Sequence, residues 1–300
     1  MKVDVGILGG AGQIAKTLSK ELPVEWGVTL YSDHGHIATD FTRRNEIDQR
    51  VEIRTYRDFP YRSHDLIVNA AGPGNSAEHM KLGAELLCLT DLFDTMALEY
   101  LKKKPKTGYI FLSSGAIYGT DYSHPVGYDS QLKFSPNAIQ PKHYYPLSKL
   151  LAEARHRWLR SLKIADLRIF GYFTRHVNLD AGFFLSEVAS CVSSGCRFST
   201  PSHDFVRDFV SPEDLADLIV LLHECGVPNG SYDAVSAKPT TKFEMLDRIT
   251  EETGLSVSGH AANRLVSPAN VTLSQSAARL GYSPKLTSLD LVVREMLAFL

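Results

Sequence analysis

The chain has 300 residues, of which 44% are hydrophobic, and a formal net charge of −2 at pH 7. A chain of this length can bury a large core as one big domain, or as one domain with a smaller lobe. The balanced charge argues against a nucleic acid as partner. No apolar run approaches the roughly 20 residues that a membrane span needs, which argues against a membrane protein.

The four cysteines, Cys88, Cys191, Cys196 and Cys225, form no C-x-x-C pair. We expect them to be free thiols in a reducing cytoplasm, without disulfides and without a metal site. The N-terminus enters an apolar run directly and lacks the layout of a signal peptide, which is also typical of a cytoplasmic protein.

The first motif is a glycine turn between an expected strand and an expected helix. Residues 3–8 are a short apolar run, typical of a buried parallel strand. Gly9, Gly12 and Ala15 then give GxxGxxA, a variant of the dinucleotide fingerprint. Its small residues let the backbone approach a pyrophosphate, and the helix N-terminus supplies N–H groups. We therefore expect a dinucleotide to contact Gly9, Gly12, Gln13 and Ile14, although a tight turn without a ligand is the alternative.

The second expected strand, residues 28–31, ends in Ser32 and Asp33. An acidic residue about 20 positions after the glycines can bind both ribose hydroxyls of NAD. If Asp33 occupies that position, NAD is favoured. If Ser32 occupies it, a 2′-phosphate fits and Arg43 or Arg44 can pair with it, which favours NADP. A solvated loop also explains the two arginines, so the cofactor is NAD or NADP.

Strands and helices continue to alternate up to residue 170. Further strands are expected over 51–56, 66–69, 109–113 and 165–170, with a long helical stretch over 77–104. This alternation predicts an α/β fold with a doubly wound, Rossmann-like parallel sheet, whose ligands bind beyond the carboxyl ends of the strands. The small residues Ala70, Ala71 and Gly72 follow the fourth strand. They suit a cofactor lying across the sheet edge, although a turn alone would explain them.

Tyr145 and Lys149 are four residues apart, which places both side chains on one face of a helix. A phenol has an ordinary pKa of about 10, and a nearby ammonium lowers it by stabilising the phenolate. Such a tyrosine can exchange protons with a substrate hydroxyl. Tyr144 is five residues from the lysine and is expected to point elsewhere. Taken alone, a Tyr-x-x-x-Lys pair is a weak signal.

The chain changes character after residue 170, where the expected elements become less regular. Ser211 and the residues after it have the pattern of a helix start, Thr241 and Glu244 form a capping-box pattern, and residues 286–300 suggest a closing helix. We expect residues 1–170 to form the dinucleotide-binding domain that carries the tyrosine and lysine. Residues 171–300 are expected to form mainly a smaller substrate-binding lobe, with some chain returning to the sheet domain.

In the order and spacing of its motifs, the chain resembles the extended short-chain dehydrogenase/reductase family, specifically the NAD-dependent epimerase/dehydratase group that acts on nucleotide sugars. The resemblance rests on GGAGQIA (9–15), NAAG (69–72), SSGAIYG (113–119), YPLSK (145–149), RIFGYF (168–173), RDFVSPEDLA (207–216) and LGYSP (280–284). It implies that Tyr145 is the catalytic acid and base, and that Lys149 lowers its pKa and binds the nicotinamide ribose. It also implies that Ser114 hydrogen-bonds the reacting oxygen and that Arg207 contacts the nucleotide diphosphate.

Structural alternatives remain for two of these residues. Ser114 could merely end a strand, and Arg207 could form only an ion pair with Asp208 or Asp214.

Besides Leu8, where a threonine is common, and Ala15, which replaces the third glycine, two further departures from the family pattern bear on the substrate and the reaction. Gly171 stands where many sugar epimerases have an asparagine that contacts the substrate. The residues after Ser114 lack the Asp-Glu pair of the 4,6-dehydratases, which disfavours water elimination because that reaction needs another general acid.

The sequence thus favours an NAD(P)-dependent nucleotide-sugar epimerase that acts through a transient 4-keto hexose. An NAD(P)H-dependent nucleotide 4-keto-sugar reductase is the alternative, because the same residues serve both reactions. A third hypothesis is a non-catalytic NAD(P)-binding regulator on the same fold. The presence of Ser114, Tyr145 and Lys149 argues against it. The resemblance also suggests a homodimer formed through the long helices of the sheet domain.

Overall fold

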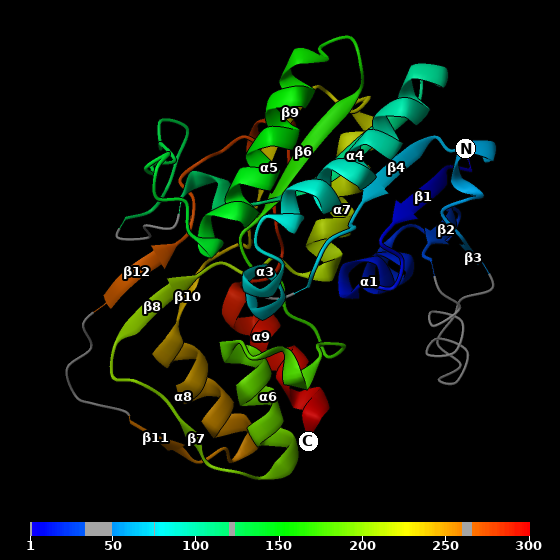
Figure 1. Cartoon of the computed structure of the whole chain (residues 1–300). Coiled ribbons are helices and arrows are strands. Elements are labelled where there is room, and N and C mark those ends of the chain that lie inside the picture. Colours follow the sequence, from blue (N-terminus) through cyan, green and yellow to red (C-terminus); the bar gives the residue numbers. More distant parts are fainter. Residues whose placement is uncertain (1, 34–49, 75, 120–123, 260–265) are drawn as a thin grey trace.

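A seven-stranded parallel sheet forms the centre of the molecule (Figure 1). The computed structural model describes residues 2–33, 50–74, 76–119, 124–259 and 266–300. In the order β3-β2-β1-β4-β5-β6-β9, the sheet comprises β3 (Val51–Arg54), β2 (Gly27–Tyr31), β1 (Asp4–Leu8), β4 (Leu66–Asn69), β5 (Gly108–Ser114), β6 (Ile164–Ile169) and β9 (Gly230–Ala234). The prediction of a doubly wound parallel sheet is therefore confirmed.

The order of the strands reverses direction between β1 and β4, which creates a crevice at their carboxyl ends. Nearly all side chains of β1 and β4 are buried. This burial stabilises the two strands and agrees with their continuous apolar sequences. In the register of the sheet, Leu8 lies opposite both Tyr31 of β2 and Asn69 of β4. The loops that follow β1 and β4 consequently start side by side.

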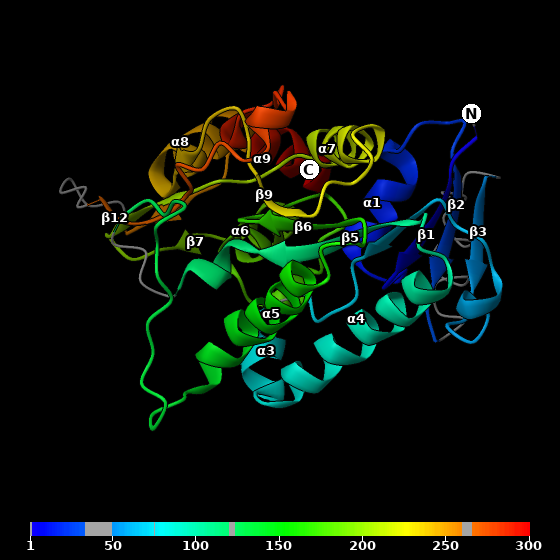
Figure 2. The ribbon, with the colours of Figure 1, turned by 90° about the horizontal axis from the view of Figure 1, so that it is seen from above.

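Helices cover both faces of the sheet (Figure 2). One face carries α1 (Gln13–Glu21) and α7 (Pro212–Glu224), and the other carries α3 (Ser76–Leu82), α4 (Glu85–Lys103) and α5 (Pro141–Trp158). The single helix expected over 77–104 is in fact two, because Gly83 adopts a left-handed φ of 51° and ends α3. Within the described residues, no helix is long and apolar enough to cross a membrane.

A smaller lobe lies beyond the carboxyl ends of the strands, in the lower half of Figure 1. It is built around its own hydrophobic core, which includes Phe173, Phe243 and Val292. The lobe contains α6 (Phe184–Ser194), α8 (Lys242–Thr253), α9 (Ser288–Met296) and two small sheets formed by β7 (Phe198–Ser199), β8 (Asp204–Arg207), β10 (Thr240–Thr241), β11 (Val257–Ser258) and β12 (Val266–Asn270). The chain after residue 170 therefore supplies this lobe, and it also supplies α7 and β9 to the sheet domain.

The helix starts read from the sequence are present. Ser211 caps α7 by accepting a hydrogen bond from the backbone N–H of Asp214 at 2.9 Å. Thr241 and Glu244 form a reciprocal capping box at the start of α8. The closing helix begins at Ser288, two residues later than expected. These caps fix where each helix enters the lobe or the sheet domain.

The expectation of four free thiols is wrong for one pair, because Cys191 and Cys196 form a disulfide. The helix α6 ends just before Gly195, whose left-handed φ of 68° turns the chain back. This turn brings the two Cα atoms within 4.7 Å of each other. The two cysteines are five residues apart and form no C-x-x-C motif, so the pairing could not be predicted from their spacing. Cys88 and Cys225 are free and exposed.

Candidate active site

The glycine turn after β1 is packed so tightly that it excludes side chains. Gly9 adopts a φ of 81°, and a Cβ atom there would lie 2.6 Å from the backbone nitrogen of Ala71. The backbone N–H of Gly9 donates to the hydroxyl of Tyr56 at 3.1 Å. Gly12 occupies the N-cap of α1 and has no side chain with which to cap it. The first N–H groups of α1 can therefore bind an anion such as a pyrophosphate.

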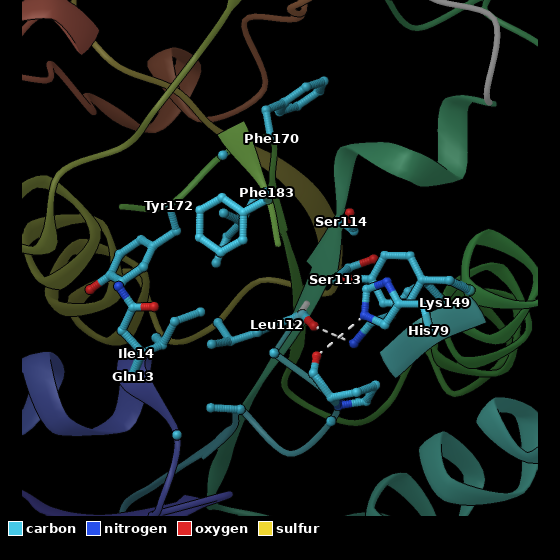
Figure 3. Close-up of a pocket in the computed structure, with 18 of the residues that line it drawn as sticks. Gln13, Ile14, His79, Leu112, Ser113, Ser114, Lys149, Phe170, Tyr172 and Phe183 are labelled. Atoms are coloured by element: carbon cyan, nitrogen blue, oxygen red, sulfur yellow. Dashed lines mark hydrogen bonds between the residues drawn. The ribbon is translucent and has the colours of Figure 1, made fainter. Parts of the chain in front are cut away.

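A pocket of about 540 Å³ opens between this turn, the ends of β4 and β5, and the smaller lobe. It gathers ten of the site residues expected from the sequence, namely Gly12, Gln13, Ile14, Ala70, Ala71, Gly72, Ser114, Tyr145, Lys149 and Arg207. In Figure 3, Gln13 and Ile14 lie on one side of the pocket and Lys149 on the opposite side. The two groups are thus separated by the width of the pocket.

The remaining expected cofactor residues lie apart from the pocket lining. Gly9 belongs to the glycine turn but does not line the pocket, while Ser32 and Asp33 follow the carboxyl end of β2. The side chain of Asp33 is exposed and that of Ser32 is half-buried. Arg43 and Arg44, the candidate partners of a 2′-phosphate, lie outside the described residues.

The helix α5 brings Tyr145 and Lys149 to the same wall of the pocket. The Lys149 ammonium is buried and donates to the backbone oxygen of Leu112 at 2.8 Å. It lies 4.6 Å from the centre of the Phe111 ring and 5.8 Å from the centre of the Tyr145 ring. Burial lowers the pKa of Lys149 to about 8, against the opposing effect of nearby carboxylates, of which Asp94 is the largest contributor.

Ser114 ends β5 and begins a short 3₁₀ turn, Gly115–Tyr118. Its hydroxyl oxygen accepts a hydrogen bond from the backbone N–H of Ala116 at 3.2 Å, so the hydroxyl proton can still be donated. A Cβ atom at Gly115 would lie only 2.5 Å from the ring of Phe170. Gly115, the first glycine of the SSGAIYG motif, thus lets the ring of Phe170 pack directly against the turn that presents Ser114.

A buried network holds the strands behind Ser114 in place. Ser113 donates to a carboxylate oxygen of Glu153 at 2.6 Å, and Arg168 makes two hydrogen bonds to the same carboxylate, at 2.6 and 3.0 Å. Arg168 also donates to the hydroxyl of Tyr118 at 2.7 Å. Burial and the carboxylate of Asp233 raise the pKa of Tyr118 to about 12, so this phenol remains protonated at neutral pH. The network joins β5, β6 and α5, and thereby fixes the wall that carries the expected catalytic residues.

Arg207 lines the pocket from the lobe, at the end of β8. Its guanidinium lies over the ring of Phe205 at 4.5 Å. The carboxylate of Asp208 accepts hydrogen bonds from Ser236 and Ser288, and that of Asp214 accepts from the backbone N–H groups at 285 and 286. These hydrogen bonds give both carboxylates structural roles.

Gly171 has no room for the asparagine that the family resemblance associates with this position. A Cβ atom at this position would lie 2.6 Å from the backbone oxygen of Asp208. A different asparagine, Asn270, lines the pocket and lies opposite Arg207 in the pairing of β12 with β8. The wall of the pocket formed by the lobe therefore carries an asparagine at a position other than 171.

The tie between α1 and the first residues of the lobe was also not foreseen. The amide of Gln13 donates to the hydroxyl of Thr174 at 2.7 Å. One turn further along α1, the hydroxyls of Thr17 and Tyr172 are hydrogen-bonded to each other. The helix that would receive the dinucleotide is thus joined directly to the segment that leads into the lobe.

Sequence reasoning missed several further residues of the pocket. His79 of α3 stacks on the ring of Tyr145, and Phe183, Phe184 and Phe209 contribute aromatic surface from the lobe. No sequence period marked these positions, because each lies on a short helix or in a loop. Among the described residues, no group of three His, Cys, Asp or Glu side chains could hold a metal ion.

Comparison with known proteins gives a family match over most of the chain and a relative of similar length. The model of the NAD dependent epimerase/dehydratase family matches residues 5–234. The UDP-glucose 4-epimerase of Streptococcus mutans serotype c is 23% identical over 329 residues, which cover 96% of this chain and 93% of that protein.

Two solved structures share the fold over almost their whole length. The UDP-glucuronic acid 4-epimerase of Bacillus cereus, in complex with UDP-4-deoxy-4-fluoro-glucuronic acid and NAD, superposes with a TM-score of 0.77 at 17% identity, covering 99% of this chain and 98% of that one. The UDP-N-acetylglucosamine 4-epimerase of Methanobrevibacter ruminantium M1 superposes with a TM-score of 0.79 at 16% identity, covering 100% and 99%.

Proposed function

This chain belongs to the NAD dependent epimerase/dehydratase family, and from that premise we propose that it is an NAD-dependent nucleotide-sugar 4-epimerase. The observation that carries the proposal is the convergence, in a single pocket, of Tyr145, Lys149 and Ser114 with the uncapped start of α1. The three relatives described above are named as UDP-sugar 4-epimerases, which favours epimerisation over the reductase alternative.

The glycine turn fits a dinucleotide, because Gly12 lines the pocket at the N-cap of α1 and has no side chain there to compete with a phosphate for the first N–H groups of the helix. When bound, NAD supplies the hydride acceptor and donor for the redox chemistry at the sugar carbon. The exposed Asp33 after β2 is suited to a ribose diol, and a relative of the same fold binds NAD. Both observations favour NAD over NADP.

The residues of the chain handle the proton and the orientation of the sugar. In the proposed mechanism, Tyr145 accepts the proton of the C4 hydroxyl as that carbon becomes a ketone, and returns it when the alcohol re-forms on the opposite face. Lys149 stabilises the phenolate through its positive charge and binds the nicotinamide ribose. Ser114 donates a hydrogen bond to the reacting oxygen. Arg207 is suited to the diphosphate of the nucleotide, because its guanidinium faces the pocket beside aromatic rings.

Assembly and location belong to the same proposal. A homodimer formed through α4 and α5 is expected from the family resemblance. The expectation of a cytoplasmic location rests partly on four free thiols, and the bond between Cys191 and Cys196 removes part of that basis.

The proposal is tested by incubating the purified protein with UDP-glucose, UDP-N-acetylglucosamine and UDP-glucuronic acid, and with GDP-, CDP- and dTDP-sugars, with and without added NAD. Separation of the products should show interconversion of C4 epimers without net production of reduced nicotinamide. Stoichiometric consumption of NADH or NADPH with a keto sugar would indicate the reductase instead. Tyr145→Phe should abolish turnover while NAD binding is retained.

Tyr144→Phe serves as the matched control, since Tyr144 is adjacent in the sequence but is not among the residues that line the pocket. This variant should keep its activity. An active Tyr145→Phe variant would remove the phenol from the mechanism and refute the proposal.

A further inference from the structure

We propose that His79 is a positioning residue for Tyr145, and that its imidazole holds the phenol ring in one orientation by stacking on its face. The inference rests on the function proposed above. The two rings are nearly parallel, with an interplanar angle of 13° and centroids 3.9 Å apart. Both side chains line the pocket, so the stacked pair forms part of its wall.

The imidazole is itself held in place. His79 is half-buried on α3, and its Nε2 atom lies 3.3 Å from the backbone oxygen of Pro73 (Figure 3). A carbonyl oxygen only accepts hydrogen bonds, so this contact assigns the ring proton to Nε2. The contact anchors the imidazole to the loop that follows β4, the same loop that carries Ala70 to Gly72.

The electrostatic surroundings keep the ring neutral. Burial lowers the pKa of His79, and the Lys149 ammonium on α5 acts in the same direction. The carbonyl of Pro73 and the carboxylate of Glu78, the neighbour on α3, act in the opposite direction but do not reverse the shift. A neutral imidazole can lie against the phenol without adding a second positive charge beside Lys149.

Such a contact matters because a phenol that exchanges protons has to keep its hydroxyl at the reacting oxygen. A pocket of about 540 Å³ leaves room for the side chain of Tyr145 to adopt other orientations. An aromatic pair contributes roughly 0.5–1.5 kcal/mol beyond the area that it buries, which corresponds to roughly a 2- to 13-fold change in the ratio of the stacked orientation to the others.

The test compares His79→Ala, which removes the stacking ring, with His79→Phe, which keeps a ring without nitrogen atoms. With the nucleotide sugar that the wild-type enzyme epimerises best, His79→Ala should lower kcat roughly 2- to 13-fold, as expected for one aromatic pair, and leave KM nearly unchanged. His79→Phe should restore most of the loss. Met80→Ala is the matched control, because Met80 is the next residue on α3 and is exposed, and it should leave kcat unchanged.

A second measurement does not depend on turnover. In protein labelled with ¹³C at the ζ carbon of tyrosine, the Tyr145 signal is assigned by its loss in Tyr145→Phe. It should move downfield in His79→Ala, because the ring current of the imidazole no longer shields it, and stay close to its wild-type position in His79→Phe. If the wild-type protein epimerises no sugar, the proposed function is refuted. The chemical shift of Tyr145 still tests the stacking in that case, because it does not depend on turnover.

Two outcomes would overturn the inference. One is a His79→Ala variant with wild-type kcat or an unmoved Tyr145 signal, which would show that the ring does not hold the phenol. The other is a His79→Phe variant as impaired as His79→Ala, which would show that the nitrogen atoms and not the stacking are what the enzyme uses.

Discussion

The buried ammonium of Lys149 should give the protein a pH-dependent stability that a Lys149→Met variant lacks. The lysine has a pKa of about 8 in the folded protein, against 10.5 as its ordinary value. This gap corresponds to roughly 3 kcal/mol between the charged and neutral forms. The side chain is buried, so solvent screens this cost little.

The direction of the effect follows from proton uptake. Below pH 8 the lysine is protonated in both the folded and the unfolded chain, and the full cost of burying the charge is present. Between pH 8 and 10.5 the unfolded chain retains a proton that the folded chain has released, so the free energy of unfolding rises with pH. Methionine does not titrate. The stability of the wild type relative to the variant should therefore increase by up to roughly 3 kcal/mol across this range.

Urea unfolding at several pH values from 7 to 10, on protein freed of bound dinucleotide, measures this difference. Lys106→Met is the control, because Lys106 is exposed, and its stability should follow that of the wild type at every pH. A constant difference between the wild type and Lys149→Met over this range would refute the reasoning. The variant should also lose epimerase turnover, since its side chain carries no charge to stabilise the Tyr145 phenolate.

Three further substitutions probe other parts of the site. Gly171→Asn should destabilise the fold by roughly 1–3 kcal/mol in urea unfolding, because its Cβ would meet the backbone oxygen of Asp208 at 2.6 Å, and a stability equal to wild type would contradict the packing described. Arg168→Met should cost roughly 3–5 kcal/mol by the same measurement, since it leaves the buried carboxylate of Glu153 without its cation, and a loss under about 1 kcal/mol would show that the carboxylate is not held by this pair. Arg207→Ala should raise KM for the nucleotide sugar roughly 10- to 100-fold, as expected for a lost charged hydrogen bond, with NAD affinity unchanged, and an unaltered KM would remove Arg207 from the substrate site.

Much of the sheet domain was predictable because its strands are buried on both faces and therefore appear as unbroken apolar runs. β1, β2 and β4 begin and end within a residue of their expected limits. β9 was not predicted, because its sequence Gly230–Ala234 contains Ser231 and Asp233. Their polar atoms are satisfied by Glu153, Tyr118 and other partners that are distant in the sequence, so the strand could be recognised only in the assembled fold.

The position of the candidate site was predictable where residues close together in the sequence also lie close together in the fold. The spacing of Tyr145 and Lys149 placed both on one helix, and the glycines located the turn that begins α1. His79 and Asn270 could not be found in this way, because each reaches the pocket through contacts between segments that no local pattern records. The pairing of Cys191 with Cys196 likewise depends on the left-handed turn that follows α6.

The hydrogen bonds from Gln13 to Thr174 and between Thr17 and Tyr172 bear on how long a coenzyme stays in the protein. Any outward swing of the lobe that would release a dinucleotide has to break both links first. An enzyme whose coenzyme ends each cycle in the oxidation state in which it began needs no exchange with the free pool. Hydrogen bonds that slow the release of the coenzyme therefore do not slow such a cycle. They also keep the reduced coenzyme bound while the sugar is a ketone.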